Sequence, residues 1–430
     1  MTAPLKIAVA GLGTVGAGTL QLIQRQGEHL AMRAGRPLIV TAVSARDRNA
    51  DRGADLSAAR WYDDAAAMAS DPEVDVVVEL IGGAEGIGRQ VVETALAHKK
   101  HVVTANKALM AEHGTLLAEK AESVGVLLAF EAAVAGGIPI IKTLREGLVG
   151  NRLSRVYGIL NGTTNYILTT MRESGRDFAE VLAEAQQLGY AEADPSFDID
   201  GVDASHKLAI LASVAFGRPV DLAGVYTEGI RHVSRHDINF AEELGYRIKL
   251  LGIARMTDRG LEQRVHPCMV RRETPIAAVE GVFNGVVAEG DFVGRVVLEG
   301  RGAGAGPTAS AVVADLVDIA TGRRVPPFGV PTSALQRLAG APMEHHQGAY
   351  YIRLMVVDQP GVIADVSAAL RDERVSLESM IQRGRSESEA VPVVLTTHVT
   401  VEAAMRKALA TIGKLASVLE PPRMIRIEDF

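Results

Sequence analysis

The stretch LKIAVAGLGTVG (Leu5–Gly16) decides how the N-terminal part of the chain folds. Its first half, Leu5–Ala10, is a short apolar run that suits a buried strand, and a helix-like stretch follows the glycines. Gly11, Gly13 and Gly16 have the spacing of a dinucleotide-binding turn. In such a turn the first glycine permits the bend, the second admits a pyrophosphate and the third lets the helix pack closely on the strand. We therefore predict a phosphate-binding turn; the alternative is a glycine-rich turn without a ligand.

Strand and helix patterns alternate to about residue 150. We expect the first helix to run to about Leu30, further strands at Leu38–Ser44, Glu73–Ile81, His101–Thr104 and Val126–Phe130, and further helices at Gly88–Lys99 and Leu109–Val124. The near-continuous valines of EVDVVVELI are typical of a parallel strand covered on both faces. Residues 1–150 are therefore predicted to form an α/β, doubly wound parallel sheet of the Rossmann type.

The pattern changes after about residue 150. We expect a strand at Leu153–Leu160, helices that include Phe178–Leu188 and Val202–Phe216, and strands around Ile248–Met256, Gln263–Val270 and Phe292–Leu298. Strands grouped after helices predict an α+β domain with a mixed or antiparallel sheet over residues 151–304. The sequence GAGAG then introduces a helix at about 305–321, which we expect to complete the first domain.

The last part of the chain has its own organisation. Residues 322–348 are rich in Pro, Gly and His and predict a linker. Residues 349–430 show strand and helix signals in the order βαββαβ, which predicts a small ferredoxin-like sandwich. None of the eleven histidines of the chain has a metal-ligand spacing. By default we assign surface or linker roles to His206, His345 and His346.

The composition excludes several classes of protein. With 430 residues, 47% of them hydrophobic, the chain can bury a large core in roughly two to four domains. A net charge of −7 without a basic stripe argues against a nucleic-acid partner. No apolar run reaches the roughly 20 residues of a membrane helix, so we expect no membrane partner. The N-terminus lacks signal-peptide features and Cys268 is the single cysteine, so we expect a cytoplasmic protein.

The residues after the second predicted strand, Ser44–Arg48 (SARDR), bear on the choice between two nicotinamide cofactors. Sites for NAD place a carboxylate at this point for the ribose 2′-hydroxyl. Arg46 and Arg48 are suited to a 2′-phosphate, whereas Asp47 fits the arrangement for NAD. We favour NADP(H) and keep NAD(H) open. A third interpretation makes both arginines solvated loop residues.

The most informative stretch is GYAEADPSFDIDGVDASHKLAIL (Gly189–Leu211). Its DIDG quartet resembles part of a calcium-binding loop. Aligning Gly201 with the invariant glycine of that loop places Lys207 at the twelfth position, where a bidentate carboxylate is needed. A cation there would repel the metal, so we reject a calcium site.

The same stretch fits a site for a polar amino-acid substrate. If Val202–Phe216 is helical, Asp203 and Lys207 are four residues apart and share one face, while the other face is apolar. A lysine held between carboxylates in a closed, dry site can donate or accept a proton. The alternative is a helix cap followed by an ion pair on the surface.

Three further segments have the character of functional loops. Lys107 follows a predicted parallel strand, at the edge where open α/β sheets bind ligands, although a solvated loop lysine is the alternative. LNGTTN starts a helix with Asn161 or Thr163 as its N-cap. The glycines of Glu131–Gly137 (EAAVAGG) would let carbonyls turn toward a cation or a substrate.

Together these motifs resemble the homoserine dehydrogenase family. The resemblance rests on GLGTVG, TANKAL, FEAAVAGGIPI, LNGTTNYIL, GYAEADPSFDIDGVDASHKLAIL and RGAGAGPTASAV, in that order, and covers about residues 5–320. The acidic segment with its lysine is the specific part. Residues 349–430 resemble an ACT domain, whose effector loop is matched by DQPGVI (Asp358–Ile363).

The resemblance implies a reaction, the reversible NAD(P)-dependent reduction of L-aspartate 4-semialdehyde to L-homoserine in threonine, methionine and isoleucine biosynthesis. Lys207 would be the general acid in reduction and the base in the reverse direction. Lys107 would lie beside cofactor and substrate and polarise the carbonyl. Asp203 would orient the substrate or Lys207, and Glu192 and Asp198 would bind the substrate through its ammonium group.

The resemblance also implies two sets of ligand-binding residues. With Arg46 added from the argument above, the cofactor set is Gly11, Gly13, Thr14, Val15, Gly16, Arg46, Thr104, Lys107 and Gly306. A structural monovalent cation, sodium, would be held mostly through backbone carbonyls by Glu131, Val134, Gly136 and Ile138. The reaction itself needs no catalytic metal.

The ACT resemblance implies control by an amino acid, with threonine as the effector. ACT domains usually pair across a dimer, so we expect a homodimer or homotetramer; a sensor that has lost its ligand is the alternative. Two rival functions remain. Another Rossmann oxidoreductase would not need carboxylates at Glu192 and Asp198 together with Lys207. A non-catalytic amino-acid sensor predicts disruption of Lys107 or Lys207, yet both lysines are present.

Overall fold

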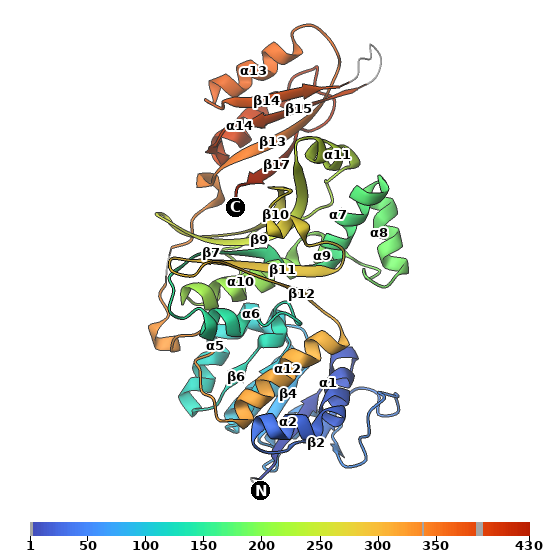
Figure 1. The fold of residues 1–430 in the computed structure, drawn as a ribbon, viewed down its shortest axis with the longest axis vertical. Coiled ribbons are helices and arrows are strands. Elements are labelled where there is room, and N and C mark those ends of the chain that lie inside the picture. The colour runs from blue at the N-terminus through green and yellow to red at the C-terminus, as the bar shows by residue number, and fades with distance from the viewer. Residues whose placement is uncertain (1–2, 338, 384–389) are drawn as a thin grey trace.

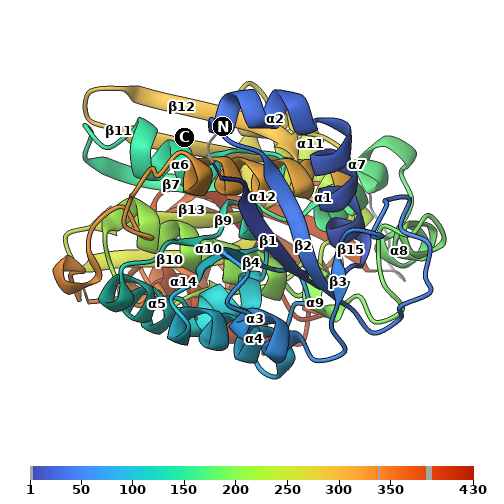
Figure 2. The ribbon, with the colours of Figure 1, turned by 90° about the horizontal axis from the view of Figure 1, so that it is seen from below.

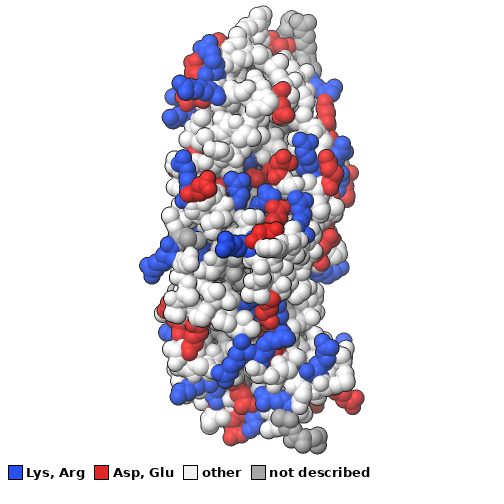
Figure 3. Space-filling model, turned by 60° about the vertical axis from the view of Figure 1, so that its left-hand side comes forward, with Lys and Arg blue, Asp and Glu red and all other residues white. Residues whose placement is uncertain are grey.

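Three units follow one another along the long axis of the molecule (Figure 1). A parallel sheet with helices lies at the N-terminal end, a broad sheet with helices in the middle, and a smaller α/β unit at the other end. The computed structural model describes residues 3–337, 339–383 and 390–430. Within these ranges no helix has both the length and the apolar character to cross a membrane. Acidic and basic side chains are interspersed along the face drawn in Figure 3.

The N-terminal sheet is doubly wound and parallel, as predicted. Its strands are β1 (Leu5–Ala10), β2 (Leu38–Ser44), β3 (Arg60–Trp61), β4 (Val76–Glu79), β5 (His101–Thr104) and β6 (Leu128–Ala129). All neighbours are parallel in the order β3-β2-β1-β4-β5-β6, which is the strand order of the Rossmann fold. The order reverses at β1 and β4, and ligands of such sheets bind beyond the carboxyl ends of the strands at this point.

Helices cover both faces of this sheet (Figure 2). They are α1 (Thr14–Arg25), α2 (Gly27–Ala34), α3 (Ala65–Ser70), α4 (Ile87–Ala97), α5 (Lys107–Val124) and α12 (Ala305–Ala320). On one face, Ile7 and Val9 of β1 share a core with Leu316 of α12. On the other face, Ala8 shares a core with Val91 of α4. The first helix is shorter than predicted, because the chain breaks at Gln26 and starts a second helix.

The middle sheet is antiparallel in its main part. Its strands are β7 (Leu153–Ile159), β8 (Tyr226–Thr227), β9 (Tyr246–Thr257), β10 (Gly260–Arg271), β11 (Phe283–Gly290) and β12 (Gly294–Arg301). In the order β12-β11-β7-β9-β10 all neighbours are antiparallel, and β8 pairs parallel with β10. The sequence did not predict β11. The start of the predicted strand at Phe292 is wrong, because this residue is 89% exposed in the turn between β11 and β12.

The helices of the middle unit place one long element at the junction with the N-terminal unit. They are η1 (Glu131–Ala133), α6 (Ile140–Lys142), η2 (Thr143–Gly147), α7 (Gly162–Ser174), α8 (Phe178–Gln187), α9 (Ser196–Ile199), α10 (Val202–Phe216), α11 (Arg235–Glu243) and η3 (Pro275–Ala278). α10 has the predicted bounds and packs against β7, β9 and β10 on one side and α5 on the other. Every residue from Asp203 to Val214 is buried, so the interpretation of Asp203 and Lys207 as a surface ion pair is wrong.

The C-terminal unit is a βαββαβ sandwich, as predicted. Its elements are β13 (Gln347–Val356), α13 (Val362–Asp372), β14 (Leu377–Gln382), β15 (Val391–Thr397), β16 (Thr400–Val401), α14 (Glu402–Ile412) and β17 (Arg423–Glu428), preceded by η4 (Thr332–Ala334) and η5 (Met343–His345). The order β17-β13-β15-β14 is antiparallel throughout. Since β17 also pairs parallel with β10, the middle and C-terminal strands form one continuous 11-stranded sheet.

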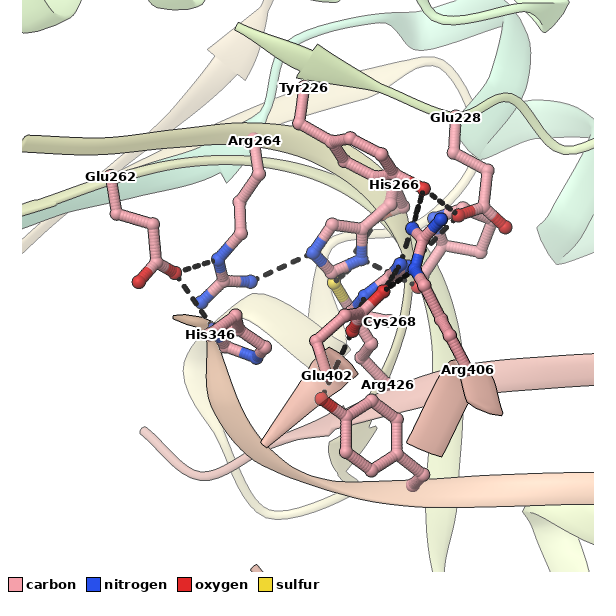
Figure 4. Close-up of polar contacts among 12 residues, drawn as sticks. Tyr226, Glu228, Glu262, Arg264, His266, Cys268, His346, Glu402, Arg406 and Arg426 are labelled. Carbon is pink, nitrogen blue, oxygen red and sulfur yellow. Dashed lines mark hydrogen bonds and ion pairs between the residues drawn. The ribbon is translucent and has the colours of Figure 1, made fainter. Parts of the chain in front are cut away.

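Buried ion pairs join the two parts of this sheet where β17 meets β10 (Figure 4). Arg264 of β10 donates to both carboxylate oxygens of Glu428 on β17, at 2.5 and 3.1 Å, and also pairs with Glu262. Arg426 of β17 donates to both oxygens of Glu402 on α14, at 2.6 and 3.0 Å. Both arginine side chains are only 1% exposed. Arg426 also donates to Glu228 of the middle unit at 2.9 Å. Because buried charges need partners, the pairs Arg264–Glu428 and Arg426–Glu228 fix how the C-terminal unit sits on the middle sheet, while Glu402 holds Arg426 from its own unit.

Two histidines contradict the expectation of surface or linker roles. His346 is buried at the same junction, with its Nδ1 2.9 Å from a carboxylate oxygen of Glu262 (Figure 4). His206 is buried on α10, where its ring packs edge-on against Phe197 at 5.4 Å between centroids. Both histidines are therefore part of the packed interior.

A third buried histidine lies in a group that resembles a set of metal ligands. Ligand-type atoms of His266, Cys268 and Glu428 lie within 4.8 Å of one another. The Glu428 carboxylate is bound by Arg264, however, and the same guanidinium donates to Nε2 of His266 at 2.8 Å. Burial and the nearby Glu428 also raise the pKa of the Cys268 thiol. The group is therefore satisfied by protein donors and disfavours a cation.

Candidate active site

The glycine turn between β1 and α1 has the geometry that a pyrophosphate requires. Gly11 has a φ of +95°, and a Cβ there would lie 2.6 Å from the carbonyl oxygen of Leu80. A Cβ on Gly16 would collide with the carbonyl of Gly11, whereas a Cβ on Gly13 would have no atom within 4 Å. The N-cap of α1 provides no side-chain hydrogen bond, so the first N–H groups from Thr14 onward are free of a side-chain cap. The turn therefore fits a dinucleotide phosphate.

The N-terminus of α12 lies beside this turn. A Cβ on Gly18 of α1 would lie 2.7 Å from the carbonyl oxygen of Ala305, so the two helices touch backbone to backbone. Gly306 follows Ala305 in the first turn of α12, and a Cβ there would face open space. Val15, the other residue predicted to hold the cofactor in this region, lies in the first turn of α1. These predicted residues are thus brought together at one edge of the sheet.

The loop after β2 separates the arginines that the sequence placed together. Arg46 is exposed immediately beyond the carboxyl end of β2. Arg48 instead lies with its guanidinium 5.7 Å from the ring centroid of Trp61 on β3, and Arg52 lies 5.6 Å from the same ring. Both Arg46 and Arg48 are exposed, but Arg46 lies nearer the end of β2 and Arg48 contacts Trp61, so Arg46 is the better candidate for a ligand at this edge.

Two lysines from different units meet at one carboxylate. On α10, Lys207 Nζ lies 2.7 Å from Oδ2 of Asp203 and donates to the carbonyl oxygen of Leu160 at 2.7 Å. Lys107 Nζ lies 2.9 Å from Oδ1 of the same Asp203. Lys107 is the first residue of α5, with Asn106 as the N-cap, and it pairs with Asp203, so the alternative of a solvated loop lysine is wrong. The expected sharing of one helix face by Asp203 and Lys207 is confirmed.

Burial and charge set the ionisation of this cluster. Burial lowers the pKa of Lys207; the Asp203 carboxylate opposes this effect and the positive charge of Lys107 adds to it. Burial alone would raise the pKa of Asp203, but the charges of Lys207 and Lys107 and the hydrogen bonds from Lys207 and Asn161 hold it well below its usual value. The result is a carboxylate that is ionised at neutral pH and that holds a lysine whose proton is easier to remove than that of a solvated lysine.

Asp198 belongs to the same cluster, whereas Glu192 lies outside it. Asp198, on the short helix α9, accepts a hydrogen bond from Nδ2 of Asn161 at 2.8 Å, and burial together with the charge of Asp203 raises its pKa. Glu192 is exposed on the segment before α9, and its backbone carbonyl accepts from Gln186. Within the described residues its side chain has no bond to the cluster.

Thr104 has a different environment from the one that a cofactor contact suggests. It is fully buried at the end of β5, and its hydroxyl donates to Oε2 of Glu79 at 2.6 Å. The other oxygen of Glu79, Oε1, accepts from the backbone N–H groups of Ile81 and Gly82 at 2.8 and 3.0 Å. Thr104 and Glu79 thus tie together the loops that follow β4 and β5.

The loop predicted to hold a cation has an unusual backbone. The four predicted residues, all of them buried, are Glu131, Val134, Gly136 and Ile138. Ala135 between them has a φ of +50°, which is uncommon outside glycine. The Glu131 carboxylate accepts from the backbone N–H groups of Ile141 and Lys142 at 2.9 and 2.8 Å, and burial raises its pKa to about 7. That carboxylate caps α6, so the donors left for a cation are backbone carbonyls.

Sequence reasoning missed three contributors to the cluster. The amide of Asn161 bonds to two carboxylates, although only its role as a helix cap was predicted. Phe197 is partly exposed, with its ring centroid 5.5 Å from Lys107 Nζ, a cation–π contact. Glu79 organises the loops around Lys107. The signal for Glu79 was present in the sequence, since a carboxylate that ends an all-valine strand is unusual.

Three regions of the chain match models of known families. Residues 11–131 match the NAD-binding domain of homoserine dehydrogenase, residues 139–317 match homoserine dehydrogenase, and residues 350–416 match the ACT domain. A homoserine dehydrogenase of Pseudomonas aeruginosa is 48% identical over 436 residues, covering 99% of each chain. That of Bacillus subtilis is 38% identical, covering 99% of this chain and 98% of its own.

Solved structures agree with these matches. The crystal structure of a homoserine dehydrogenase from Thiobacillus denitrificans has a TM-score of 0.94 at 46% identity, covering 99% of each chain. A hyperthermophilic archaeal homoserine dehydrogenase in complex with NADPH has a TM-score of 0.64 at 27% identity, covering 76% of this chain and all of its own. The predicted resemblance is confirmed. The chain belongs to the homoserine dehydrogenase family, as a nicotinamide-dependent oxidoreductase that acts on a CH–OH group and carries a C-terminal ACT domain.

Proposed function

We propose that this chain reversibly reduces L-aspartate 4-semialdehyde to L-homoserine with NADP(H), that Lys207 handles the proton, and that threonine controls the rate. The observation that carries the proposal is the placement of the Lys207 ammonium. It is buried on α10, 2.7 Å from both Asp203 and the Leu160 carbonyl, where Lys107 arrives from the unit that carries the dinucleotide turn. A lysine in this position can exchange a proton with a substrate oxygen.

Each residue of the cluster has a separate role in the proposed reaction. When bound, the nicotinamide supplies or takes up hydride at the carbon that carries the reacting oxygen. Lys207 gives a proton to that oxygen in reduction and removes it in oxidation, and its lowered pKa favours the second task. Lys107 polarises the carbonyl, and Asp203 keeps the two ammonium groups in place. Asp198 receives the substrate ammonium, with Glu192 from the exposed segment as its partner.

A spectrophotometric assay of homoserine oxidation with each nicotinamide cofactor, with and without threonine, tests the proposal as a whole. We expect faster turnover with NADP than with NAD, and a lower rate when threonine is added. Absence of turnover with both cofactors would contradict the proposed reaction, and a rate insensitive to threonine would contradict the proposed effector.

Arg46→Ala tests the preference for NADP(H). The archaeal relative has been solved with NADPH, and in this chain Arg46 is the first exposed cation beyond β2. Loss of a charge-assisted bond to the 2′-phosphate should weaken NADP binding about 10- to 100-fold and leave NAD binding nearly unchanged. Fluorescence titration with both cofactors measures this. Arg48→Ala, which removes the guanidinium beside Trp61, is the control and should have the smaller effect. If Arg46→Ala weakened the binding of NADP and of NAD equally, the assignment of Arg46 to the 2′-phosphate would be wrong.

Lys107→Met tests the electrostatic coupling of the two lysines. Removing the positive charge of Lys107 favours the protonated form of Lys207, so the pKa of Lys207 rises. Oxidation of homoserine needs neutral Lys207, so the pH at which kcat/KM rises should move upward. The value of kcat/KM should also fall at every pH, because the carbonyl loses the charge of Lys107. Lys100→Met is the control, because Lys100 Nζ bonds to the carbonyl of Val74 and should leave the profile in place. A profile that stays or moves downward in Lys107→Met would contradict the coupling.

The loop that contains Glu131, Val134, Gly136 and Ile138 is proposed to hold a structural monovalent cation through its backbone carbonyls. Support comes from the burial of the loop and the left-handed conformation of Ala135, a costly conformation that a bound ion would help to maintain. The thermal midpoint should then be higher in sodium chloride than in choline chloride at equal ionic strength, and equal midpoints would count against the ion.

Threonine is proposed to bind the C-terminal unit at the Asp358–Ile363 turn, in a homodimer or homotetramer. Removing residues 349–430 would be a poor test of this site. The deletion would leave the β10 edge unpaired and Arg264 without Glu428. Calorimetric titration of the full chain with threonine avoids this problem, and sedimentation equilibrium gives the subunit number.

A further inference from the structure

Asn161 makes hydrogen bonds in two directions from the junction of β7 and α7. Its side-chain oxygen accepts from the backbone N–H of Thr164 at 2.8 Å and so caps α7. Its side-chain nitrogen donates to Oδ1 of Asp198 and to Oδ2 of Asp203, both at 2.8 Å. Because the cap requires an acceptor, the orientation of the amide is fixed, and its NH₂ group must face the carboxylates.

The two carboxylates need such a group. Burial and the charge of Asp203 raise the pKa of Asp198, and the hydrogen bond from Asn161 opposes this rise. An amide offers two hydrogens and no net charge, so it can hold both carboxylates without neutralising either. A lysine or arginine in its place would cancel the negative charge that attracts a substrate ammonium.

The backbone next to Asn161 holds the other half of the cluster. The carbonyl of Leu160 accepts from Lys207 Nζ at 2.7 Å. Leu160 therefore holds the lysine, and the next residue, Asn161, holds the two carboxylates. The place of Leu160 and Asn161 is well defined, because β7 is paired on both sides, with β9 and β11. A Cβ on Gly162 would lie 2.7 Å from the carbonyl oxygen of Val282, so the turn is closely packed.

We propose that Asn161 is a positioning residue of the reaction. Its amide sets the placement of Asp198, which receives the substrate ammonium, relative to Asp203, which holds Lys207. The inference rests on the proposed function, since Asn161 acts through residues whose roles are assigned there. The alternative hypothesis is that Asn161 has a purely structural role as the N-cap of α7.

Three substitutions separate the two roles. Serine and aspartate are good N-caps, so Asn161→Ser and Asn161→Asp keep α7 capped but lose the amide donors, whereas Asn161→Ala loses both. We expect Asn161→Ser to lower kcat/KM for homoserine about 10- to 100-fold, with a higher KM and a lower kcat. Asn161→Asp should be worse, because it adds a third carboxylate. The thermal midpoint of Asn161→Ser and its NADP binding should stay close to those of the parent.

A different order of kcat/KM among the three Asn161 variants would overturn the inference. If Asn161 is only a cap, Asn161→Ser and Asn161→Asp keep parental kcat/KM and only Asn161→Ala loses it. Asn165→Ser is the matched control, because this buried asparagine of α7 donates instead to the carbonyls of Val279 and Phe283, at 3.1 Å each, and should leave kcat/KM unchanged. Lys207→Met, run in parallel, separates the two failures. An active Lys207→Met would overturn the proposed function, and an active Asn161→Ser beside an inactive Lys207→Met would overturn this inference alone.

Discussion

Lys207→Met should lower kcat about 10²- to 10⁴-fold in both directions while the dinucleotide still binds with parental affinity. The range is that of a lost general acid or base. Methionine fills a similar volume on α10, so the helix should stay packed between the middle sheet and α5. Steady-state kinetics of homoserine oxidation and fluorescence titration with NADPH measure the two effects separately. A variant that keeps near-parental kcat would refute the role of Lys207.

Lys249→Met is the matched control for this substitution. Lys249 is also a buried lysine, and its Nζ donates to the carbonyl of Val279 at 2.6 Å and pairs with Glu280 at 3.3 Å. Its bonds are of the same kinds as those of Lys207, but it lies on β9 outside the cluster. The control is expected to keep kcat within a few-fold of the parent, even though removal of a buried lysine costs stability. A comparable loss of kcat in Lys249→Met would assign the effect to folding rather than to proton transfer.

Arg264→Met should lower the free energy of unfolding by about 3–5 kcal/mol, the cost of removing one partner from a buried ion pair. Arg264 is 1% exposed and binds Glu428 and Glu262, so its loss takes the same guanidinium from two buried carboxylates, of which Glu262 keeps only its contact with His346. The loss falls at the junction of β10 and β17 (Figure 4), so we also expect the C-terminal unit to detach more easily. Urea unfolding, followed by circular dichroism, measures the change.

Arg371→Met is the control for the junction. Arg371 pairs with Asp372, but both side chains are well exposed, so little change in the urea midpoint is expected. An unchanged midpoint in Arg264→Met would show that the buried pairs do not hold the two parts of the sheet together.

The fold was predictable where a local pattern decides it. The valines of β4 and the glycines after β1 specify a parallel strand and a phosphate turn from neighbouring residues alone, and the structure agrees. Phe283–Gly290 was missed because its two glycines and asparagine weaken any alternation, although pairing with β7 and β12 makes it a strand. The pairing of β17 with β10 joins strands more than 150 positions apart in the sequence, and it leaves no periodic signal in either.

Charged residues at the junction illustrate the same limit. Arg264 and Arg426 look like solvent-facing positions of amphipathic strands, because a lone arginine is rarely buried. Their carboxylate partners come from β10 itself, β17, α14 and the segment after β8, and only the folded chain brings them together. His346 was assigned to a linker for the same reason, since its partner Glu262 is 84 positions earlier in the chain.

In the candidate site, spacing within one helix was predictable and contacts between units were not. The interval of four residues predicted that Asp203 and Lys207 share a face, and they do. The meeting of Lys107 with Asp203 depends on how α5 packs on α10, and the bonds of Asn161 depend on how β7 ends beside both carboxylates. The arrangement of Glu192 near the substrate stays a prediction.

A crystal structure of the parent chain with NADP(H) and homoserine would decide the role of Lys207 most directly. The placement of Lys207 predicts that its Nζ lies within about 3 Å of the homoserine hydroxyl oxygen, with the substrate ammonium near Asp198. A hydroxyl that contacts Lys107 alone, or that lies away from α10 altogether, would contradict the assignment.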